Sequence, residues 1–211
     1  MCDKYNSVYI NLDRVEDRRK EFEAQPAVSA CNITRLAAVD GQTLDKVEGA
    51  PLKRGQQGCV RSHMRAWEEA SKSDATPFTV IFEDDYIIPE NYNSALPQIL
   101  EEAQEACDGK PADVVWLHRT LLEHGAEDPV TDHLTRATNP SNGMHAYAVS
   151  AGGAAKLMDM HNKDNTHFFK IALDAYFQQH RDPKSSSLCM VAADPPLGDV
   201  PVSPFSTTEE E

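Results

Sequence analysis

The sequence predicts an α/β domain with a mostly parallel central sheet, and three observations support this class. Segments rich in β-branched and aromatic residues alternate along the chain with segments of helical periodicity. Two strand-like segments, Phe78–Phe82 and Asp113–Leu117, are dominated by continuous apolar runs, which are typical of strands buried on both faces. The length of 211 residues fits one domain. We expect this domain to span residues 1–193, before an extended or disordered acidic tail over residues 194–211.

The N-terminal part of the chain has clear strand and helix signals. Alternating β-prone residues predict a first strand over residues 7–12. Asp13 is a candidate N-cap for a helix over Val15–Ala24, and Pro26 should end that helix because proline has no backbone N–H to donate. A second strand is expected over residues 33–39.

The middle of the chain carries the clearest amphipathic helix. Residues 42–57 are polar and contain glycine and proline, so they predict a loop. Gly58 should open a helix, in which we expect Trp67 to lie in the core. The buried face of this helix is expected to hold Cys59, His63, Ala66, Trp67 and Ala70. Beyond the strand at residues 78–82, a further helix is expected over residues 94–107, with Pro97 tolerated in its first turn.

The C-terminal part continues the alternation. Residues 123–142 are rich in acidic residues, Thr, Asn and Pro, and we expect a mobile excursion there rather than core. A strand over residues 143–150 precedes a helix over residues 154–161. A second helix is expected over residues 168–180, and a last strand over residues 188–191.

Composition excludes several classes of partner. The formal net charge of −14 argues against nucleic acid or an anionic membrane surface as the main partner. No apolar run reaches the ~18 residues that a transmembrane helix needs, and the N-terminus has no signal-peptide pattern, so we expect a cytoplasmic protein. The five cysteines are odd in number, widely spaced and without a C-x-x-C pair, which favours reduced thiols. The sequence does not specify the oligomeric state.

Three consecutive carboxylates, Glu83, Asp84 and Asp85, directly follow the strand at residues 78–82. The carboxyl ends of strands form the edge at which open α/β sheets bind ligands. Adjacent carboxylates repel one another, and a hard divalent cation such as Mg²⁺ or Mn²⁺ would relieve that repulsion. The alternative is a solvated acidic turn that closes the strand.

Several stretches of the chain, in this order, resemble motifs of glycosyltransferase family 25, the group of lipopolysaccharide-biosynthesis proteins and procollagen galactosyltransferases. The stretches are Tyr9–Arg14 with Asp17–Arg19, Ala38–Gly41, Gly55–His63 with Trp67, Ile81–Asp85, His145–Ser150 with Gly153–Leu157, and, more weakly, Leu173–Tyr176. Each motif is modest alone, and their order over residues 9–157 makes the signal specific. The chain departs from the pattern at His118, where we expect glycine, and in residues 123–142.

The resemblance implies a GT-A-like nucleotide-sugar-binding fold and an inverting transfer of a hexose from a UDP-sugar. Galactose is the first candidate for the sugar and glucose the second. The acceptor would be a hydroxyl of a glycan, a lipid-linked sugar or hydroxylysine, and a divalent metal, Mn²⁺ or Mg²⁺, would neutralise the diphosphate that leaves. By position, Asp85 is the favoured metal ligand, with Glu83 or Asp84 as its partner.

The resemblance also implies residues for donor binding. The basic cluster after the first strand offers Arg14 and Arg18 to phosphate oxygens, although both could instead form salt bridges. Asn11 could contact the nucleotide or cap a turn. His63 is a donor-site candidate that could equally be a hydrogen-bonded packing residue, and His145 could approach the metal, approach the sugar or be structural.

An inverting transfer needs a general base that takes the proton of the acceptor hydroxyl. Asp174 is the candidate by position, and Asp113 and Asp132 are weaker ones. Two other functions compete with a transferase. The first is a non-catalytic nucleotide-sugar-binding or interaction domain of the same fold, and the second is an unrelated metal-dependent phosphoryl or nucleotidyl enzyme. No G-x-x-x-x-G-K-[ST] loop supports the latter.

Overall fold

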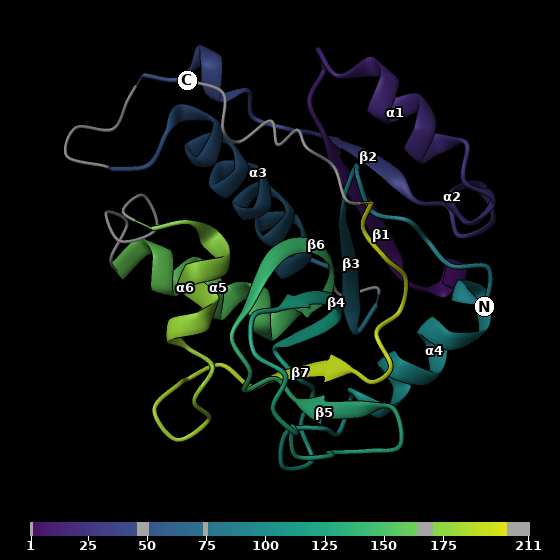
Figure 1. Ribbon diagram of the computed structural model, residues 1–211, viewed down its shortest axis with the longest axis vertical. Helices are drawn as coiled ribbons and strands as arrows, with labels where there is room; N and C mark the ends of the chain where they lie inside the picture. Colours follow the sequence, from purple (N-terminus) through teal and green to yellow (C-terminus); the bar gives the residue numbers. More distant parts are fainter. Residues whose placement is uncertain (1, 46–50, 74–75, 164–170, 202–211) are drawn as a thin grey trace.

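The computed structural model describes residues 2–45, 51–73, 76–163 and 171–201, and these build a three-layer α/β/α domain (Figure 1). The strands form one sheet in the order β2-β1-β3-β6-β4-β7-β5. They are β1 (Asn6–Asn11), β2 (Thr34–Ala37), β3 (Phe78–Glu83), β4 (Val114–Leu121), β5 (Leu134–Arg136), β6 (Ser141–Ser150) and β7 (Met190–Ala193). The pairings give β1, β2, β3, β4 and β7 a common direction, whereas β5 and β6 run the opposite way. The prediction of an α/β, GT-A-like fold with a mostly parallel sheet is therefore confirmed.

The helices cover both faces of this sheet, with α1, α2 and α4 on one face and α3, α5 and α6 on the other (Figure 1). They are α1 (Glu16–Glu23), α2 (Pro26–Ala30), α3 (Arg54–Ser71), α4 (Tyr92–Glu102), α5 (Ala151–Lys163) and α6 (Leu173–Gln179), with 3₁₀ turns η1 (Cys2–Lys4) and η2 (Gly41–Thr43).

Two apolar cores lie on opposite faces of the sheet because successive strand residues point to opposite sides. Tyr9 and Phe82 belong to the core beneath α1, α2 and α4. Their neighbours Ile10 and Ile81 belong to the core beneath α3, α5 and α6, together with Trp67. Trp67 is fully buried, as predicted. Both faces of β3 are thus buried, which confirms the interpretation of its continuous apolar run.

The position of α3 corrects the sequence analysis. The helix begins at Arg54, within the segment expected to be a loop, because the Gln56 side chain accepts a hydrogen bond from the backbone N–H of Lys53 at 3.0 Å. Gly58 lies inside the helix rather than at its start. A Cβ atom at Gly58 would lie 2.5 Å from the backbone oxygen of Val39. Glycine is therefore required there by a close helix–loop approach, which no local propensity reveals.

The predicted boundaries of two other helices were also wrong. Val15, not Asp13, is the N-cap of α1, and the Asp13 carboxylate instead pairs with Arg35 at 2.5 Å. Pro26 follows α1 as expected but is itself the first residue of α2, a position where its missing N–H costs nothing. In α4, Pro97 lies beyond the first turn, and the helix ends at Glu102 rather than at residue 107.

The polar segment over residues 123–142 contributes to the core, against expectation. It contains β5, which pairs with β7, and Leu134 of that strand is buried. Glu127 holds the segment together. Its carboxylate accepts hydrogen bonds from the Arg119 side chain and from the backbone N–H groups of Thr138 and Asn139 at 2.7 and 2.6 Å.

The expectation of reduced thiols was wrong for four of the five cysteines. Disulfides join Cys2 to Cys31 and Cys107 to Cys189, across sequence separations of 29 and 82 residues. The first links η1 to the end of α2, and the second links the turn after α4 to the residue before β7. Wide spacing in the sequence gave no sign of either pair. Cys59 is the cysteine that stays free.

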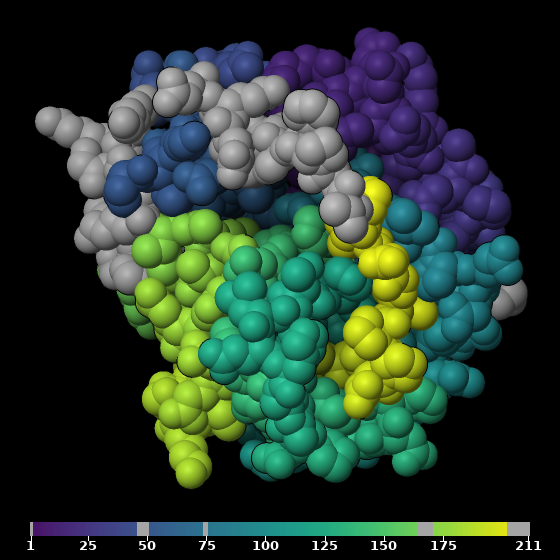
Figure 2. All heavy atoms as spheres, viewed as in Figure 1, coloured from purple at the N-terminus to yellow at the C-terminus, as the bar shows by residue number. Residues whose placement is uncertain are grey.

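The chain after β7 returns along the sheet. The backbone N–H of Leu197 donates to the carbonyl of Leu117 at 2.7 Å, and Asp199 forms an antiparallel bridge with Ile87. Figure 2 shows this segment in yellow, running over the surface beside the teal part of the chain. Of the expected tail, residues 194–201 are thus held against the domain, and residues 202–211 lie outside the described residues. The start of the helix predicted over residues 168–180 also lies outside them, and α6 forms its C-terminal part.

None of the helices in the described ranges is long and apolar enough to cross a membrane.

Candidate functional site

A cavity of about 770 Å³ opens at the carboxyl ends of β1 and β3. The parallel register pairs Ile10 with Glu83, so the residues that follow these strands meet at one edge of the sheet. β6 lies on the other side of β3 and runs antiparallel, which brings its N-terminal half to the same edge. Nine of the site residues predicted from the sequence line this cavity: Asn11, Arg14, Arg18, His63, Glu83, Asp84, Asp85, His145 and Asp174. The two weaker candidates for the general base, Asp113 and Asp132, are not among its lining residues.

Two of the three carboxylates share a histidine. The Nδ1 atom of His145 lies 3.1 Å from Oε2 of Glu83 and 3.0 Å from Oδ1 of Asp85. One possible ligand atom from each of these three residues lies within 4.8 Å of the other two. The set offers two carboxylate oxygens and one imidazole nitrogen. This combination fits Mn²⁺, and the two oxygens also fit Mg²⁺.

Hydrogen bonds and burial shift the pKa values of His145 and Glu83 in this group. Burial alone would lower the pKa of His145, but hydrogen bonds to Asp85 and Glu83 raise it to about 10. Burial would raise the pKa of Glu83, and the hydrogen bonds from His145 and His63 overcome this and bring it below its usual value. A positively charged imidazolium therefore lies between two carboxylates and balances their negative charge, as a bound cation would.

Asp84 is turned away from this group. Its carboxylate accepts a hydrogen bond from the side-chain amide of Asn11 at 2.6 Å and pairs with the guanidinium of Arg18. Burial raises the pKa of Asp84 to about 6, although Arg18 and Asn11 oppose the shift. Within the described part of the chain, Asp84 is not a member of any three-ligand cluster. Of the two partners predicted for Asp85, the geometry therefore favours Glu83.

Ion pairs hold the two arginines predicted to bind the donor, Arg14 and Arg18. Arg18 bridges Asp84 and Asp85, and its contact with Asp85 is 3.0 Å. Arg14 pairs with Asp40 at 2.9 Å. Asn11 is buried. Both arginines still line the cavity, where a diphosphate could reach them.

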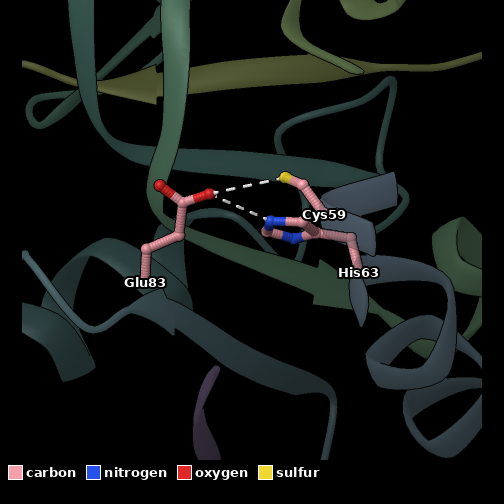
Figure 3. A group of neighbouring side chains, drawn as sticks. All are labelled: Cys59, His63 and Glu83. Carbon is pink, nitrogen blue, oxygen red and sulfur yellow. Dashed lines mark hydrogen bonds and ion pairs between the residues drawn. The ribbon is translucent and has the colours of Figure 1, made fainter. Parts of the chain in front are cut away.

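His63 lies on the buried face of α3, and its ring has partners on both sides. Nδ1 lies 2.9 Å from the hydroxyl of Tyr147, and Nε2 lies 3.2 Å from Oε1 of Glu83. Figure 3 shows that the thiol of Cys59, one helical turn earlier, points to the same oxygen, with Sγ at 3.9 Å. Burial raises the pKa of the Cys59 thiol, and the carboxylates of Glu83, Asp174 and Asp85 raise it further. His63 is thus both a packed histidine and a residue of the cavity wall.

Asp174 lies in the first turn of α6, on the cavity wall. Its carboxylate accepts hydrogen bonds from the backbone N–H of Gly143 at 3.2 Å and of Ala175 at 2.7 Å. Both of these donors belong to the backbone, and the residue remains part of the cavity lining. Asp113, a weaker candidate, is buried and bound to Lys156 at 2.8 Å and to the backbone N–H of Cys189 at 2.8 Å, so it has a structural role.

Sequence reasoning assigned no role to several residues of the cavity wall. Asp40 belongs to a recognised motif but its partner, Arg14, is 26 residues away in the sequence. His118, at the departure from the family pattern, lies on the wall with burial lowering its pKa. Asp199 comes from the segment expected to be a tail, and its bridge to Ile87 holds it at the cavity. No signal in the sequence indicated this last contact.

Comparison with known proteins gives a family match. The sequence matches the model of a family described as "Glycosyltransferase family 25 (LPS biosynthesis protein)" over residues 6–176. It is 32% identical over 168 residues to a Bos taurus protein named "Probable inactive glycosyltransferase 25 family member 3", across 71% of this chain and 28% of that protein.

Two further relatives have names that state an activity. The chain is 25% identical over 169 residues to "Procollagen galactosyltransferase 1-A" of Xenopus laevis, across 71% of this chain and 27% of that protein. It is 25% identical over 150 residues to "Procollagen lysyl hydroxylase and glycosyltransferase" of Acanthamoeba polyphaga mimivirus, across 68% of this chain and 16% of that protein. The chain therefore matches less than a third of the length of each of these relatives.

Proposed function

Because the chain belongs to glycosyltransferase family 25, we propose that it transfers a hexose from a UDP-sugar to a hydroxyl group with inversion at the anomeric carbon. Galactose is the first candidate, which the names of the procollagen galactosyltransferase relatives support, and glucose is the second. Those names also favour hydroxylysine over a glycan or a lipid-linked sugar as the acceptor. The observation that carries the proposal is the convergence of Glu83, Asp85 and His145 in a cavity that also holds Asp174.

Glu83, Asp85 and His145 would hold the divalent ion, Mn²⁺ or Mg²⁺. When bound, that ion would act as a Lewis acid that neutralises the diphosphate of the donor. His145 must lose its proton to act as a ligand, so ion binding releases a proton. These residues fit the ion because both carboxylates lie next to the same imidazole: Nδ1 of His145 is 3.1 Å from Glu83 and 3.0 Å from Asp85.

The chain's own residues would divide the remaining work. Arg14, Arg18 and Asn11 would contact the nucleotide and its phosphates, since a guanidinium can bind two phosphate oxygens at once. Asp174 would accept the proton of the acceptor hydroxyl. As that proton leaves, the oxygen of the acceptor hydroxyl attacks the anomeric carbon, and the bond from that carbon to the diphosphate breaks. His63 would support the site by holding Glu83 in place at 3.2 Å.

Calorimetric titration of UDP and UDP-galactose, with and without Mn²⁺, tests the donor site. We expect Mn²⁺ to increase UDP affinity in the native chain. Asp85→Asn should keep the native fold and reduce the Mn²⁺-dependent increase in UDP affinity by about 10- to 100-fold, because changes around metal ligands reduce metal affinity by that factor. UDP binding that is strong and unaffected by Mn²⁺ would overturn the metal assignment. An unchanged rate of sugar transfer in Asp85→Asn would also exclude it.

A second function, a non-catalytic nucleotide-sugar-binding or interaction domain, is supported by the name of the Bos taurus relative and by the short span of the match. This function predicts UDP binding without release of the sugar from UDP-galactose in the presence of acceptors. Free galactosylated product in a transfer assay would decide for the enzyme.

The cytoplasmic location expected from the N-terminus stays a prediction, and the disulfides weigh against it. Disulfides persist in oxidising compartments and are rare in the cytosol. Two such bonds join distant parts of this domain. We therefore favour an oxidising compartment as the place where this domain folds.

A further inference from the structure

A second group of possible metal ligands lies on the other side of Glu83. Cys59 and His63 are four residues apart in α3, so their side chains lie on the same face of the helix. Figure 3 shows both pointing to one carboxylate oxygen, Oε1 of Glu83, at 3.9 Å from Sγ and 3.2 Å from Nε2. The ligand atoms of the three residues lie within 4.8 Å of one another.

The two oxygens of Glu83 face different groups. Oε1 faces His63 and Cys59, whereas Oε2 lies 3.1 Å from His145. The group with Asp85 offers mainly oxygen, and the group with Cys59 offers sulfur, nitrogen and oxygen. Hard ions such as Mg²⁺ select oxygen ligands, and thiolate selects softer ions. The two groups are therefore suited to ions of different chemistry.

The surroundings of His63 hold its ring in a suitable orientation. The hydroxyl of Tyr147 lies 2.9 Å from Nδ1 and also accepts a hydrogen bond from Nε1 of Trp67 at 2.8 Å. Its two lone pairs can accept from both nitrogens, so the ring can carry its proton on Nδ1 and leave Nε2 free for a metal. Metal-binding histidines are usually oriented in this way, through a hydrogen bond from their other ring nitrogen.

We propose that Cys59, His63 and Glu83 bind a thiophilic divalent cation, with Zn²⁺ as the defining case. Three protein ligands leave a fourth tetrahedral position, which Zn²⁺ fills with water or a small ligand when its site is open. All three residues line the cavity, so that position is accessible from it. Binding turns the thiol into a thiolate and releases its proton to solvent, while the proton on the His63 ring stays on Nδ1. This binding does not depend on the proposed transferase activity.

Because of the disulfides, a metal titration can test the thiol of Cys59 specifically. Four cysteines are paired, so Cys59 is the thiol available to an ion in the unreduced chain. Co²⁺ reports on its own coordination, because a thiolate ligand adds a sulfur-to-metal charge-transfer absorption. The experiment is a titration of the unreduced full chain with Co²⁺, followed by displacement with Zn²⁺, in the absence of nucleotide.

We expect a charge-transfer band at one equivalent of Co²⁺ that one equivalent of Zn²⁺ abolishes. Cys59→Ser should remove the band and weaken Zn²⁺ binding by at least about 10- to 100-fold, since loss of a residue behind a ligand already costs that much. Asp85→Asn, the matched control, should keep the band because Asp85 belongs to the other group. No band in the native chain, or a band that survives Cys59→Ser in a variant with native circular dichroism, would overturn the proposal. UDP affinity and sugar transfer are not read in this experiment, so its failure leaves the proposed function standing.

Discussion

The same glycine-to-alanine substitution in two helices should have opposite effects on stability. Gly58 in α3 lies against the loop that carries Asp40, and a Cβ there would meet the backbone oxygen of Val39 at 2.5 Å and the backbone nitrogen of Gly41 at 2.8 Å. Gly152 in α5 is exposed, and a Cβ there would meet nothing within 4 Å. The pair therefore separates the cost of the close contact from the intrinsic preference of helices for alanine.

The magnitudes follow from these contacts. Alanine is favoured over glycine in a helix by up to about 1 kcal/mol. Gly152→Ala should gain part or all of this amount. At Gly58 the neighbours are backbone atoms, which cannot rotate away, and overpacking costs about 1–3 kcal/mol. Gly58→Ala should therefore lose up to about 2 kcal/mol after a gain of about 1 kcal/mol in helix propensity is subtracted.

Urea unfolding followed by tryptophan fluorescence measures both variants, because Trp67 and Trp116 are buried. The same backbone contacts hold Asp40, the partner of Arg14, so UDP affinity should also fall in Gly58→Ala and stay native in Gly152→Ala. A Gly58→Ala variant as stable as Gly152→Ala would show that α3 and the Val39 loop do not approach as closely as described.

Three further substitutions test separate parts of the structure. Glu127→Gln leaves the buried guanidinium of Arg119 without its charged partner and should cost about 3 kcal/mol in urea unfolding at pH 7. Hydrogen bonds from Arg119 and from backbone N–H groups act against burial and lower the pKa of Glu127 from 4.5, so the contribution of Glu127 to stability is present above pH 4.5 and is lost as the pH falls below it. The difference in stability between the variant and the native protein should therefore shrink below pH 4.5, and a difference that stays constant would contradict this reasoning. Removing the disulfide with Cys107→Ser and Cys189→Ser should lower the free energy of unfolding by about 4.5 kcal/mol, as expected for its separation of 82 residues, and an unchanged urea midpoint in the unreduced protein would mean that the bond does not form. Arg14→Ala should weaken UDP binding by about 10- to 100-fold, the value of a charged hydrogen bond, with a nearly native melting temperature because half-exposed ion pairs contribute little; native UDP affinity would leave Arg14 as a salt-bridge residue.

The sequence predicted the edge of the sheet at which the site forms, but not the division of labour among its carboxylates. The apolar run of β3 and the acidic residues after it placed Glu83, Asp84 and Asp85 at a ligand-binding edge. Glu83 ends β3, and Asp84 and Asp85 lie in the turn after it, where the backbone N–H of Tyr86 donates to the carbonyl of Glu83 at 3.2 Å. In this turn Glu83 and Asp85 meet at His145, whereas Asp84 contacts Asn11. Strand alternation ends before the turn, so it could not have distinguished Glu83 from Asp84 as the partner of Asp85.

Other features depend on contacts between distant segments, which local patterns do not encode. The partner role of His145 follows from the placement of β6 beside β3, and strand order is not written in any one segment. The early start of α3 was missed because glycine disfavours helices in general, whereas Gly58 serves the approach of Val39. The disulfide pairs were missed for the same reason, since only the folded chain brings Cys107 and Cys189 together, with Cα atoms 6.2 Å apart.

The charges of the site couple the proposed binding of an ion to the proposed binding of the donor. Arg18 lies against Asp84 and Asp85, and protonated His145 lies between Asp85 and Glu83, so positive side chains already balance the carboxylates. A divalent ion at Asp85 must displace the His145 proton and compete with the Arg18 guanidinium. The displaced guanidinium then needs an anion, which the diphosphate of a nucleotide sugar would supply. Because each of these two ligands removes an obstacle to the other, the arrangement favours mutual strengthening of their binding, and such coupling is reciprocal by thermodynamic necessity.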